Sequence, residues 1–344
     1  MARKRRSNPS LPLNATGKRI LMLRQDRIGD VLVSLPIIHA LKKRFPTAHI
    51  DALFGENNFF VAPHDSAFEH RYVYHKNIGA IVSMIRTLRR IRYDFLIDFM
   101  DNVSASSTLL ASAIGANCAV GIDKENAYTY DVVVPRLPQS TVHIVDRLGE
   151  LLRPFGIDPA TEDLRLQYAI PETADERAKT WMDQYAASPR LGINISGSGA
   201  AKEWGSKNFS LLIALIRAEH PGLSIVLFCA PGEELIAAAI SAERDVPVFP
   251  PGTFEEFAAG IKHCDALITV DTSAVHLAAA FQRPAVVLFV HDNPALTPWV
   301  PYRVPHRAVT TSMHSVKHIS VEEVALAFTS LDQECGITAA VAAR

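Results

Sequence analysis

One short apolar run near the amino terminus, Ile20-Leu21-Met22-Leu23, strongly constrains what this chain can fold into. It is continuous and bounded by polar residues, which is typical of a strand buried on both faces of a parallel sheet. Gly29 then permits a tight turn, and Asp30 stands where a helix would begin. The segment predicts a carboxylate at the carboxyl edge of a sheet, where open α/β folds bind ligands. A helix-capping role for Asp30 is the alternative.

The alternation of strands and helices continues along the chain in two series. In the first, we expect strands at 19–23, 48–54, 70–74, 93–98, 117–121 and near 130–134, and helices at 57–63, 77–91 and 103–114. In the second, we expect strands at 190–195, 223–229, 246–249, 266–270 and 285–289, and helices at 207–219, 232–242, 253–263 and 273–281. A stretch rich in Pro, Asp and Thr at 156–175 predicts a linker. This α/β pattern implies two parallel sheets covered on both faces, with a ligand cleft between two domains.

A second strand-to-helix turn also carries polar side chains. The apolar run Leu267-Ile268-Thr269-Val270 is followed by Asp271-Thr272-Ser273 and then by a helical segment. Backbone N–H groups at the start of such a helix suit an anion, particularly a phosphate. His276 falls five residues after Asp271, on the first turns of that helix. A buried structural histidine is the alternative interpretation.

Together these segments resemble glycosyltransferase family 9, which includes the lipopolysaccharide heptosyltransferases. The first motif runs from Arg24 through Gly29-Asp30 to Pro36, and the second from Asp271 to Ala280. Between them, the stretch from Asn194 to Trp204 is similar to the phosphate loop of the family, and His143-Ile144-Val145-Asp146-Arg147 to the helix that closes its first half. The resemblance covers roughly residues 18 to 330.

The resemblance implies a GT-B fold, in which two Rossmann-like domains face each other across a cleft. It places an acceptor-binding domain at 18–160 and a nucleotide-sugar-binding domain at 176–330. Outside the resemblance, we expect a disordered basic arm at 1–17 and a tail at 331–344. The resemblance implies inversion at the anomeric carbon without a metal or other cofactor. The implied donor is ADP-L-glycero-D-manno-heptose, and the implied acceptor is a lipid A–inner core oligosaccharide.

The resemblance also assigns roles to individual residues. Asp30 matches the catalytic base and Lys202 the lysine that contacts the donor diphosphate, while Arg24 and Arg27 suit an anionic acceptor. The remaining expected donor-binding residues are Ser196, Ser198, Glu233, Asp271, Thr272, Ser273 and His276. For residues 196–202 the alternative is a flexible surface loop. For Glu233 it is an acidic residue favoured by the dipole of a helix start.

Three departures from the family pattern affect these expectations. Ser273 replaces the usual Gly, the loop Val290–Pro294 differs from the usual Gly-Pro/Ala-Thr/Ser, and 98–104 lacks the Gln-Gly of some members. Alternatives therefore stay open: a family member using another nucleotide sugar, a nucleotide-sugar epimerase, or an inactive binding protein. Product analysis separates the first two from each other, because transfer requires an acceptor and epimerisation does not.

Charge and composition exclude several other classes of protein. The 35 basic residues balance 36 acidic ones, so no overall field favours nucleic acid. No apolar run has the length of a membrane span, and the basic start lacks the apolar core of a signal peptide. The four cysteines lack metal-ligand or disulfide spacing, which fits a cytoplasmic protein. For Arg3-Lys4-Arg5-Arg6 two interpretations stay open, solvation or peripheral contact with anionic lipid of the inner membrane.

Overall fold

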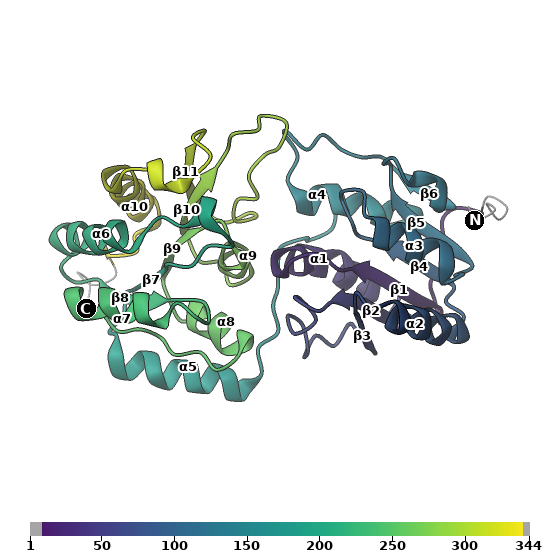
Figure 1. Ribbon diagram of the computed structural model, residues 1–344, viewed down its shortest axis with the longest axis horizontal. Coiled ribbons are helices and arrows are strands. Elements are labelled where there is room, and N and C mark those ends of the chain that lie inside the picture. Colours follow the sequence, from purple (N-terminus) through teal and green to yellow (C-terminus); the bar gives the residue numbers. More distant parts are fainter. Residues whose placement is uncertain (1–8, 340–344) are drawn as a thin grey trace. The chain divides into compact units, whose positions relative to one another are not determined.

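The computed structural model describes residues 9–339 of the chain. These residues divide into two compact units, Met1–Leu164 (unit 1) and Arg165–Arg344 (unit 2). Each unit is built around its own parallel sheet (Figure 1). The basic stretch Arg3–Arg6 lies outside the described residues. No helix within 9–339 combines the length and apolar character needed to cross a bilayer.

Unit 1 contains a six-stranded parallel sheet in the order β3-β2-β1-β4-β5-β6. This is the 3-2-1-4-5-6 order of a Rossmann fold, whose chain direction across the sheet reverses between β1 and β4. The strands are β1 (Arg19–Arg24), β2 (His49–Gly55), β3 (Arg71–Tyr74), β4 (Phe95–Asp98), β5 (Cys118–Ile122) and β6 (Val132–Val134).

Four helices accompany this sheet: α1 (Ile28–Arg44), α2 (Ile78–Ile91), α3 (Ala105–Ala113) and α4 (Ile144–Gly149). Leu88 of α2 and Leu110 of α3 pack with Leu21 and Leu96 of the sheet in one buried cluster. Successive side chains of a strand point to opposite faces, so Ile20 and Met22, which are also buried, belong to the other face. α1 and α4 pack against one another. The continuous apolar strand that the sequence predicts is therefore covered on both sides.

Unit 2 contains a five-stranded parallel sheet in the order β11-β10-β9-β7-β8. A single bridge between Leu227 and Val248 adds a rudimentary strand beyond β8, which completes the same Rossmann order. Its strands are β7 (Arg190–Asn194), β8 (Ser224–Phe228), β9 (Ala266–Val270), β10 (Ala285–Val290) and β11 (His306–Thr311). Its helices are α5 (Glu172–Tyr185), α6 (Ser206–Glu219), α7 (Glu234–Arg244), α8 (Phe254–Lys262), α9 (Ser273–Ala280) and α10 (Val321–Cys335).

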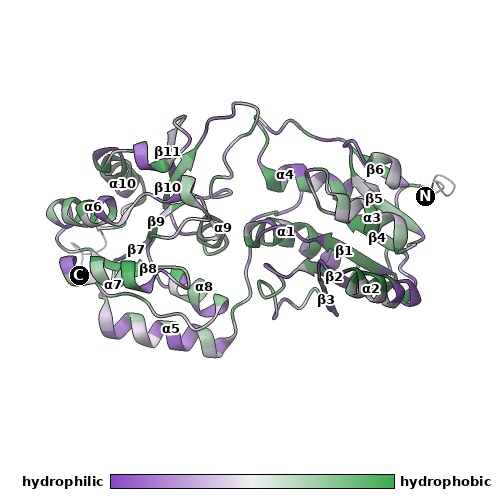
Figure 2. Cartoon of the chain, viewed as in Figure 1, coloured by the Kyte–Doolittle hydropathy of each residue, from purple (hydrophilic) through white to green (hydrophobic). Residues whose placement is uncertain are grey.

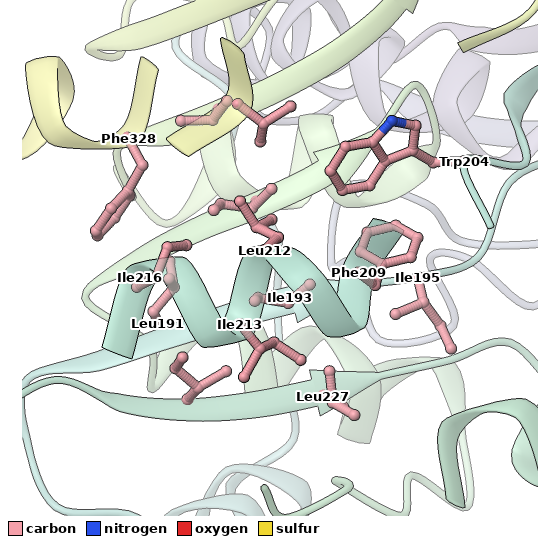
Figure 3. Packing of buried hydrophobic residues seen from close by; sticks show 14 of the residues in the cluster. Leu191, Ile193, Ile195, Trp204, Phe209, Leu212, Ile213, Ile216, Leu227 and Phe328 are labelled. Atoms are coloured by element: carbon pink, nitrogen blue, oxygen red, sulfur yellow. The ribbon is translucent and has the colours of Figure 1, made fainter. Parts of the chain in front are cut away.

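The core of unit 2 forms where α6 and α10 cover one face of the sheet. Leu212, Ile213 and Ile216 of α6 pack over Ile193 and Leu227 (Figure 3). Strands β8, β9 and β10 are almost entirely apolar. Helix α5, in contrast, is largely hydrophilic in Figure 2, with only Ala174, Ala178 and Met182 buried.

The α/β class predicted from the sequence is confirmed, but several elements differ from expectation. Residues 57–63 form turns instead of a helix, because the side chain of Asn58 accepts the N–H of Gly55 at 2.8 Å. Residues 246–249 make one bridge and no strand. Helix α5 begins inside the expected linker, and β11 and α10 were missed.

Both ends of the described chain are more ordered than expected. In the predicted arm 1–17, Leu13 and Ala15 are buried, and the N–H of Leu13 donates to the carbonyl of Pro154 at 2.7 Å. The predicted tail 331–344 begins inside α10, where Leu331 is buried, and Ile337 also packs into the core. Ser320 and Glu323 form a capping box at the start of α10, a signal that the sequence does contain.

Candidate active site

Two polar loops of unit 2 meet at the point where its strand order reverses. The loop after β7 and the turn after β9 leave the carboxyl ends of adjacent parallel strands. Open α/β sheets bind their ligands in the crevice at this point. Lys202 Nζ pairs with Asp271 Oδ2, and both side chains are partly exposed, at 24% and 32%. The structure thus joins the two predicted segments by an ion pair beyond the carboxyl ends of β7 and β9.

Asn194, which the sequence analysis did not assign to the site, ties these loops together. Its buried Nδ2 donates to Thr269 Oγ1 at 2.9 Å, and lies 3.3 Å from Thr272 Oγ1 and 3.2 Å from the carbonyl of Ser196. Thr272 in turn caps α9 by accepting the N–H of Ala274 at 3.3 Å. The amide therefore fixes the turn that orients the first N–H groups of α9. The sequence signal that could have identified Asn194 is its position as a polar residue at the end of a predicted strand.

Ser196 connects the β7 loop to the loop after β8. Its Oγ donates to Glu233 Oε2 at 2.7 Å and accepts the N–H of Ala230 at 2.6 Å. Ser196 is only 6% exposed. In this structure its proton is directed to Glu233 instead of an exposed crevice, so its observed role is to hold two loops together. Ser198, two residues on, lies exposed in the loop.

The two glycines of this loop have separate structural reasons. A Cβ on Gly197 would collide with the backbone carbonyl of Lys202, so the chain can fold back on itself only with glycine there. Gly199 has a φ of 131°, which disfavours other residues. The path of the loop itself therefore accounts for Gly197.

Trp204 and His276 both belong to buried surroundings. The indole Nε1 of Trp204 donates to the carbonyl of Ile319 at 2.8 Å, and its ring stands edge-on to Phe209 with centroids 5.0 Å apart (Figure 3). His276 is 4% exposed on the first turns of α9, with its ring centroid 6.1 Å from that of Trp299. Ser273, the first residue of α9, is half-buried. Trp204 therefore stabilises the core beneath the loop.

In unit 1, the predicted base lies at the corresponding reversal point, after β1. Asp30 Oδ1 accepts from Arg24 Nη2 at 3.1 Å, and Oδ2 accepts the N–H of Arg27 at 3.1 Å. The carboxylate is 14% exposed. The second contact is that of a capping carboxylate, so Asp30 does cap α1. The ion pair with Arg24 and the capping contact with the N–H of Arg27 together hold the carboxylate of Asp30 in one orientation.

The expectation that Arg24 faces an acceptor is wrong for this structure. Its side chain is completely buried and also donates to the carbonyls of Asp30 and Phe99. A guanidinium with five donors needs such acceptors when it leaves water. The buried side chain of Arg24 therefore fixes the position of the loop 25–30. Arg27 is exposed, as an acceptor-binding residue would need to be.

A buried charged network, which the sequence analysis did not identify, lies beside Arg24. Lys124 Nζ is 3.3 Å from Asp98 Oδ2, with both side chains inaccessible to solvent, and Tyr130 Oη donates to the same oxygen at 2.5 Å. Burial lowers the pKa of Lys124, and Asp98 opposes that shift. Burial also raises the pKa of Asp26, which Arg24 opposes and the neighbouring carboxylates of Asp30 and Asp98 reinforce. The site thus contains a second carboxylate four residues before Asp30.

Arg147, the last residue of the motif that begins at His143, contacts the loop that follows β4. Its Nη2 lies 3.0 Å from Asp101 Oδ2, with both side chains almost fully buried. Gln139 Nε2 donates to the same carboxylate oxygen at 2.7 Å. The motif residue therefore anchors the stretch 98–104, where the chain departs from the family pattern.

Most of the cysteines are buried within the two units. Three of the four cysteines are buried, and burial raises the pKa of Cys264 to about 12. Across residues 9–339, no group of three or more His, Cys, Asp or Glu side chains is arranged to hold a metal ion.

Comparisons with known proteins agree with this architecture. Lipopolysaccharide heptosyltransferase 3 of Escherichia coli K12 is 25% identical over 289 residues, which cover 79% of this chain and 82% of the relative. The crystal structure of a family 9 glycosyltransferase from Veillonella parvula has a TM-score of 0.77 at 20% identity, covering 94% of this chain and all of the other. The E. coli heptosyltransferase WaaC, solved with ADP, has a TM-score of 0.70 at 19% identity, covering 91% and 99%.

These neighbours confirm the predicted GT-B fold class. The family model described as "Glycosyltransferase family 9 (heptosyltransferase)" matches residues 81–325, well over half of the chain. The match includes both unit 2 motifs and the network around Asp98 and Lys124. The chain therefore belongs to glycosyltransferase family 9, the heptosyltransferase family.

Proposed function

We propose that this glycosyltransferase moves a heptose from ADP-L-glycero-D-manno-heptose to the inner core of lipopolysaccharide, with inversion at the anomeric carbon. The observation that carries the proposal is the ion pair between Lys202 and Asp271 at the reversal point of unit 2, beside the start of α9. Its curated relatives include a lipopolysaccharide heptosyltransferase, and ADP is bound in the crystal structure of WaaC.

Lys202 and α9 supply complementary charge for a donor diphosphate. In this structure Asp271 neutralises Lys202. A diphosphate carries more negative charge than one carboxylate, so it would compete for the ammonium group while the N–H groups of α9 meet its oxygens. Ser198 lies in the loop after β7. On the first turns of α9 are Ser273 and His276. Ser196 and Glu233 support this site by joining the loops after β7 and β8.

Asp30 is the proposed general base. Inverting transfer needs a group that takes the proton of the acceptor hydroxyl as its oxygen attacks the anomeric carbon. The bond to the diphosphate breaks at the same time, and the leaving ADP keeps the electron pair. Arg24 and the N–H of Arg27 orient Asp30 for this role. Lys202 and the amides of α9 stabilise the charge that develops on ADP.

The acceptor proposed here is anionic and lipid-linked, which suits the exposed Arg27 and a cytoplasmic enzyme working at the inner membrane surface. The test is product analysis with ADP-heptose, with and without lipopolysaccharide that lacks heptose. Mass spectrometry should show one heptose added to the acceptor, only when both substrates are present. A changed sugar nucleotide in the absence of acceptor would indicate an epimerase instead. Transfer from a different nucleotide sugar alone would leave the family assignment standing and reject the donor.

A further inference from the structure

Helix α2 of unit 1 leaves much of its apolar surface uncovered. Leu88 is its one fully buried residue, and Met84, Ile85 and Ile91 are only partly buried against the core. Ile78 is 82% exposed and Val82 is 40% exposed. These two residues lie one turn apart on the same side of the helix. An amphipathic helix whose exposed side begins with two aliphatic residues is poorly explained by packing within its own unit.

The same helix is strongly cationic. From Tyr72 to Tyr93 the chain contains no acidic residue, while Lys76, Arg86, Arg89 and Arg90 are all exposed. Among residues 9–339, no carboxylate lies within ion-pair distance of the guanidinium groups of Arg86, Arg89 and Arg90. The dipole at the carboxyl end of a helix favours basic residues there, but accounts for no exposed Ile or Val at the other end.

A neighbouring loop adds aromatic residues to this surface. β2 and β3 are adjacent parallel strands, so the loops after them leave the same edge of the sheet. Glu56 in the first loop pairs with His75 in the second, 2.7 Å apart. Phe59 and Phe60 are 46% and 37% exposed in the first loop, and Ile78 begins the helix directly after the second.

From this geometry we propose that α2, with Phe59 and Phe60, is the surface by which the enzyme docks on an anionic lipid bilayer. Ile78, Val82 and the two phenylalanines enter the boundary between headgroups and acyl chains, and Arg86, Arg89 and Arg90 contact lipid phosphates. Basic amphipathic helices with exposed apolar residues bind membrane surfaces in this way. The occupant is the bilayer itself, whichever oligosaccharide and donor the active site takes.

Flotation of the full chain with vesicles tests the proposal. Vesicles of phosphatidylethanolamine and phosphatidylglycerol in a 3:1 ratio should bind the protein. Vesicles of phosphatidylcholine should bind it far less, because they lack the negative surface charge that attracts basic residues. Replacing Arg86, Arg89 and Arg90 by Gln should weaken binding about a hundredfold. Replacing Ile78 and Val82 by Ser should weaken it roughly tenfold. Binding should also fall as salt is raised.

Matched controls are available in unit 2. Leu235 and Leu326 are 86% and 68% exposed, and Lys179, Lys207 and Lys317 are exposed cations. Replacing the two leucines by Ser, or the three lysines by Gln, should leave vesicle binding as in the parent. All variants are first compared by circular dichroism and thermal unfolding, and the α2 substitutions are solvent-exposed, so folding should persist.

A further variant replaces Arg3, Lys4, Arg5 and Arg6 by Gln. If it alone abolishes binding while the α2 variants bind like the parent, the basic arm is the attachment site and the proposal is overturned. Equal binding to both kinds of vesicle, or none to either, overturns it as well. Transfer to a detergent-solubilised acceptor measures the proposed function separately, because this assay contains no bilayer.

Discussion

Arg24 Nη2 lies 3.1 Å from Asp30 Oδ1, and the arginine side chain that makes this contact is completely buried. A cation at this depth persists because the carbonyls of Asp30 and Phe99 also accept its hydrogens. The carboxylate of Asp30 is thus held by a cation, Arg24, whose own position is fixed. The position of Asp30 therefore depends on Arg24 at the end of β1 and on Phe99 directly after β4, and not on its own loop alone.

The first prediction concerns the base. Asp30→Asn keeps the size of the side chain and one acceptor oxygen, which can accept either from Arg24 or from the N–H of Arg27, so one of the two contacts is lost. Circular dichroism should show that the fold persists. If Asp30 is the general base, turnover should fall roughly 10²–10⁴-fold. Binding of ADP, measured by calorimetry, should stay the same. Turnover close to that of the parent would leave Asp30 as a helix cap only.

Asp26→Asn is the matched comparison, since it also removes one carboxylate charge beside Arg24. We expect a much smaller loss of turnover from this variant. If turnover fell several hundredfold in the Asp26→Asn variant and not in the Asp30→Asn variant, the base would be Asp26. Burial already raises the pKa of Asp26.

The second prediction concerns the donor. Lys202→Ala removes the ammonium group that pairs with Asp271. ADP affinity should fall roughly 10- to 100-fold, the range for losing a hydrogen bond to a charged group. Lys207→Ala, five residues on and exposed at the start of α6, is the control and should bind ADP like the parent. Equal affinity in the Lys202 variant would reject its role at the diphosphate.

The third prediction concerns the stability of unit 1. Lys124→Met leaves Asp98 buried with Tyr130 but without its cation. Breaking one side of a buried ion pair costs about 3–5 kcal/mol. Urea unfolding followed by circular dichroism should show this loss. All three tryptophans, Trp181, Trp204 and Trp299, lie in unit 2, so their fluorescence is an internal reference for the other unit. An unchanged transition would mean that the pair contributes nothing net.

The strand-turn-helix segments could be predicted because the sequence carries their whole signal locally. Ile20–Leu23 is continuously apolar, and Asp271 to Ser273 marks a helix start in any context. The ion pair of Lys202 with Asp271 could be anticipated only from the resemblance, because it joins residues that the chain separates widely. The network of Asp98, Lys124 and Tyr130 could not, since it forms by sheet topology that places β5 beside β4.

Arg24 illustrates a different limit. Sequence alone gives an arginine after a strand, which is usually exposed. Its burial follows from tertiary acceptors, above all the carbonyl of Phe99, that no local pattern displays. In the same way, Ser196 had the right residue type for phosphate binding, but its partner Glu233 lies in another loop.

The fourth prediction concerns pH and the packing of α5 on α8. Asp175 Oδ2 lies 2.6 Å from Lys262 Nζ, and Oδ1 lies 2.8 Å from His263 Nε2. Burial alone would raise the pKa of Asp175, but the hydrogen bonds from Lys262 and His263 outweigh it and lower the pKa. A carboxyl with a lowered pKa stabilises the fold above its unfolded value, about 3.9. That stability is lost as the pH falls through the folded pKa.

Asp175→Asn should therefore lower the free energy of unfolding by about 1 kcal/mol at pH 7, as for a partly exposed ion pair. The difference from the parent should begin to shrink below about pH 4, where the carboxyl of the unfolded parent takes up a proton, and should vanish below the lowered pKa of the folded state. Tryptophan fluorescence in urea at pH 7 and pH 3.5 measures both values. Glu176→Gln, the exposed neighbour on α5, should show no such difference. A deficit of the same size at both pH values would assign the effect to packing instead of charge.

The fifth prediction concerns metal ions. The leaving ADP must be stabilised by some positive charge, and the candidate groups are Lys202 and the first N–H groups of α9. If they suffice, transfer should continue at the parental rate after dialysis against EDTA and assay in its presence. Added Mg²⁺ should leave the rate of the parent unchanged. Lys202→Ala sharpens the test, because a metal could partly replace the missing cation in that variant alone. Loss of parental activity in EDTA, restored by Mg²⁺ or Mn²⁺, would show that the reaction needs a metal and that Lys202 and α9 do not suffice for the leaving ADP.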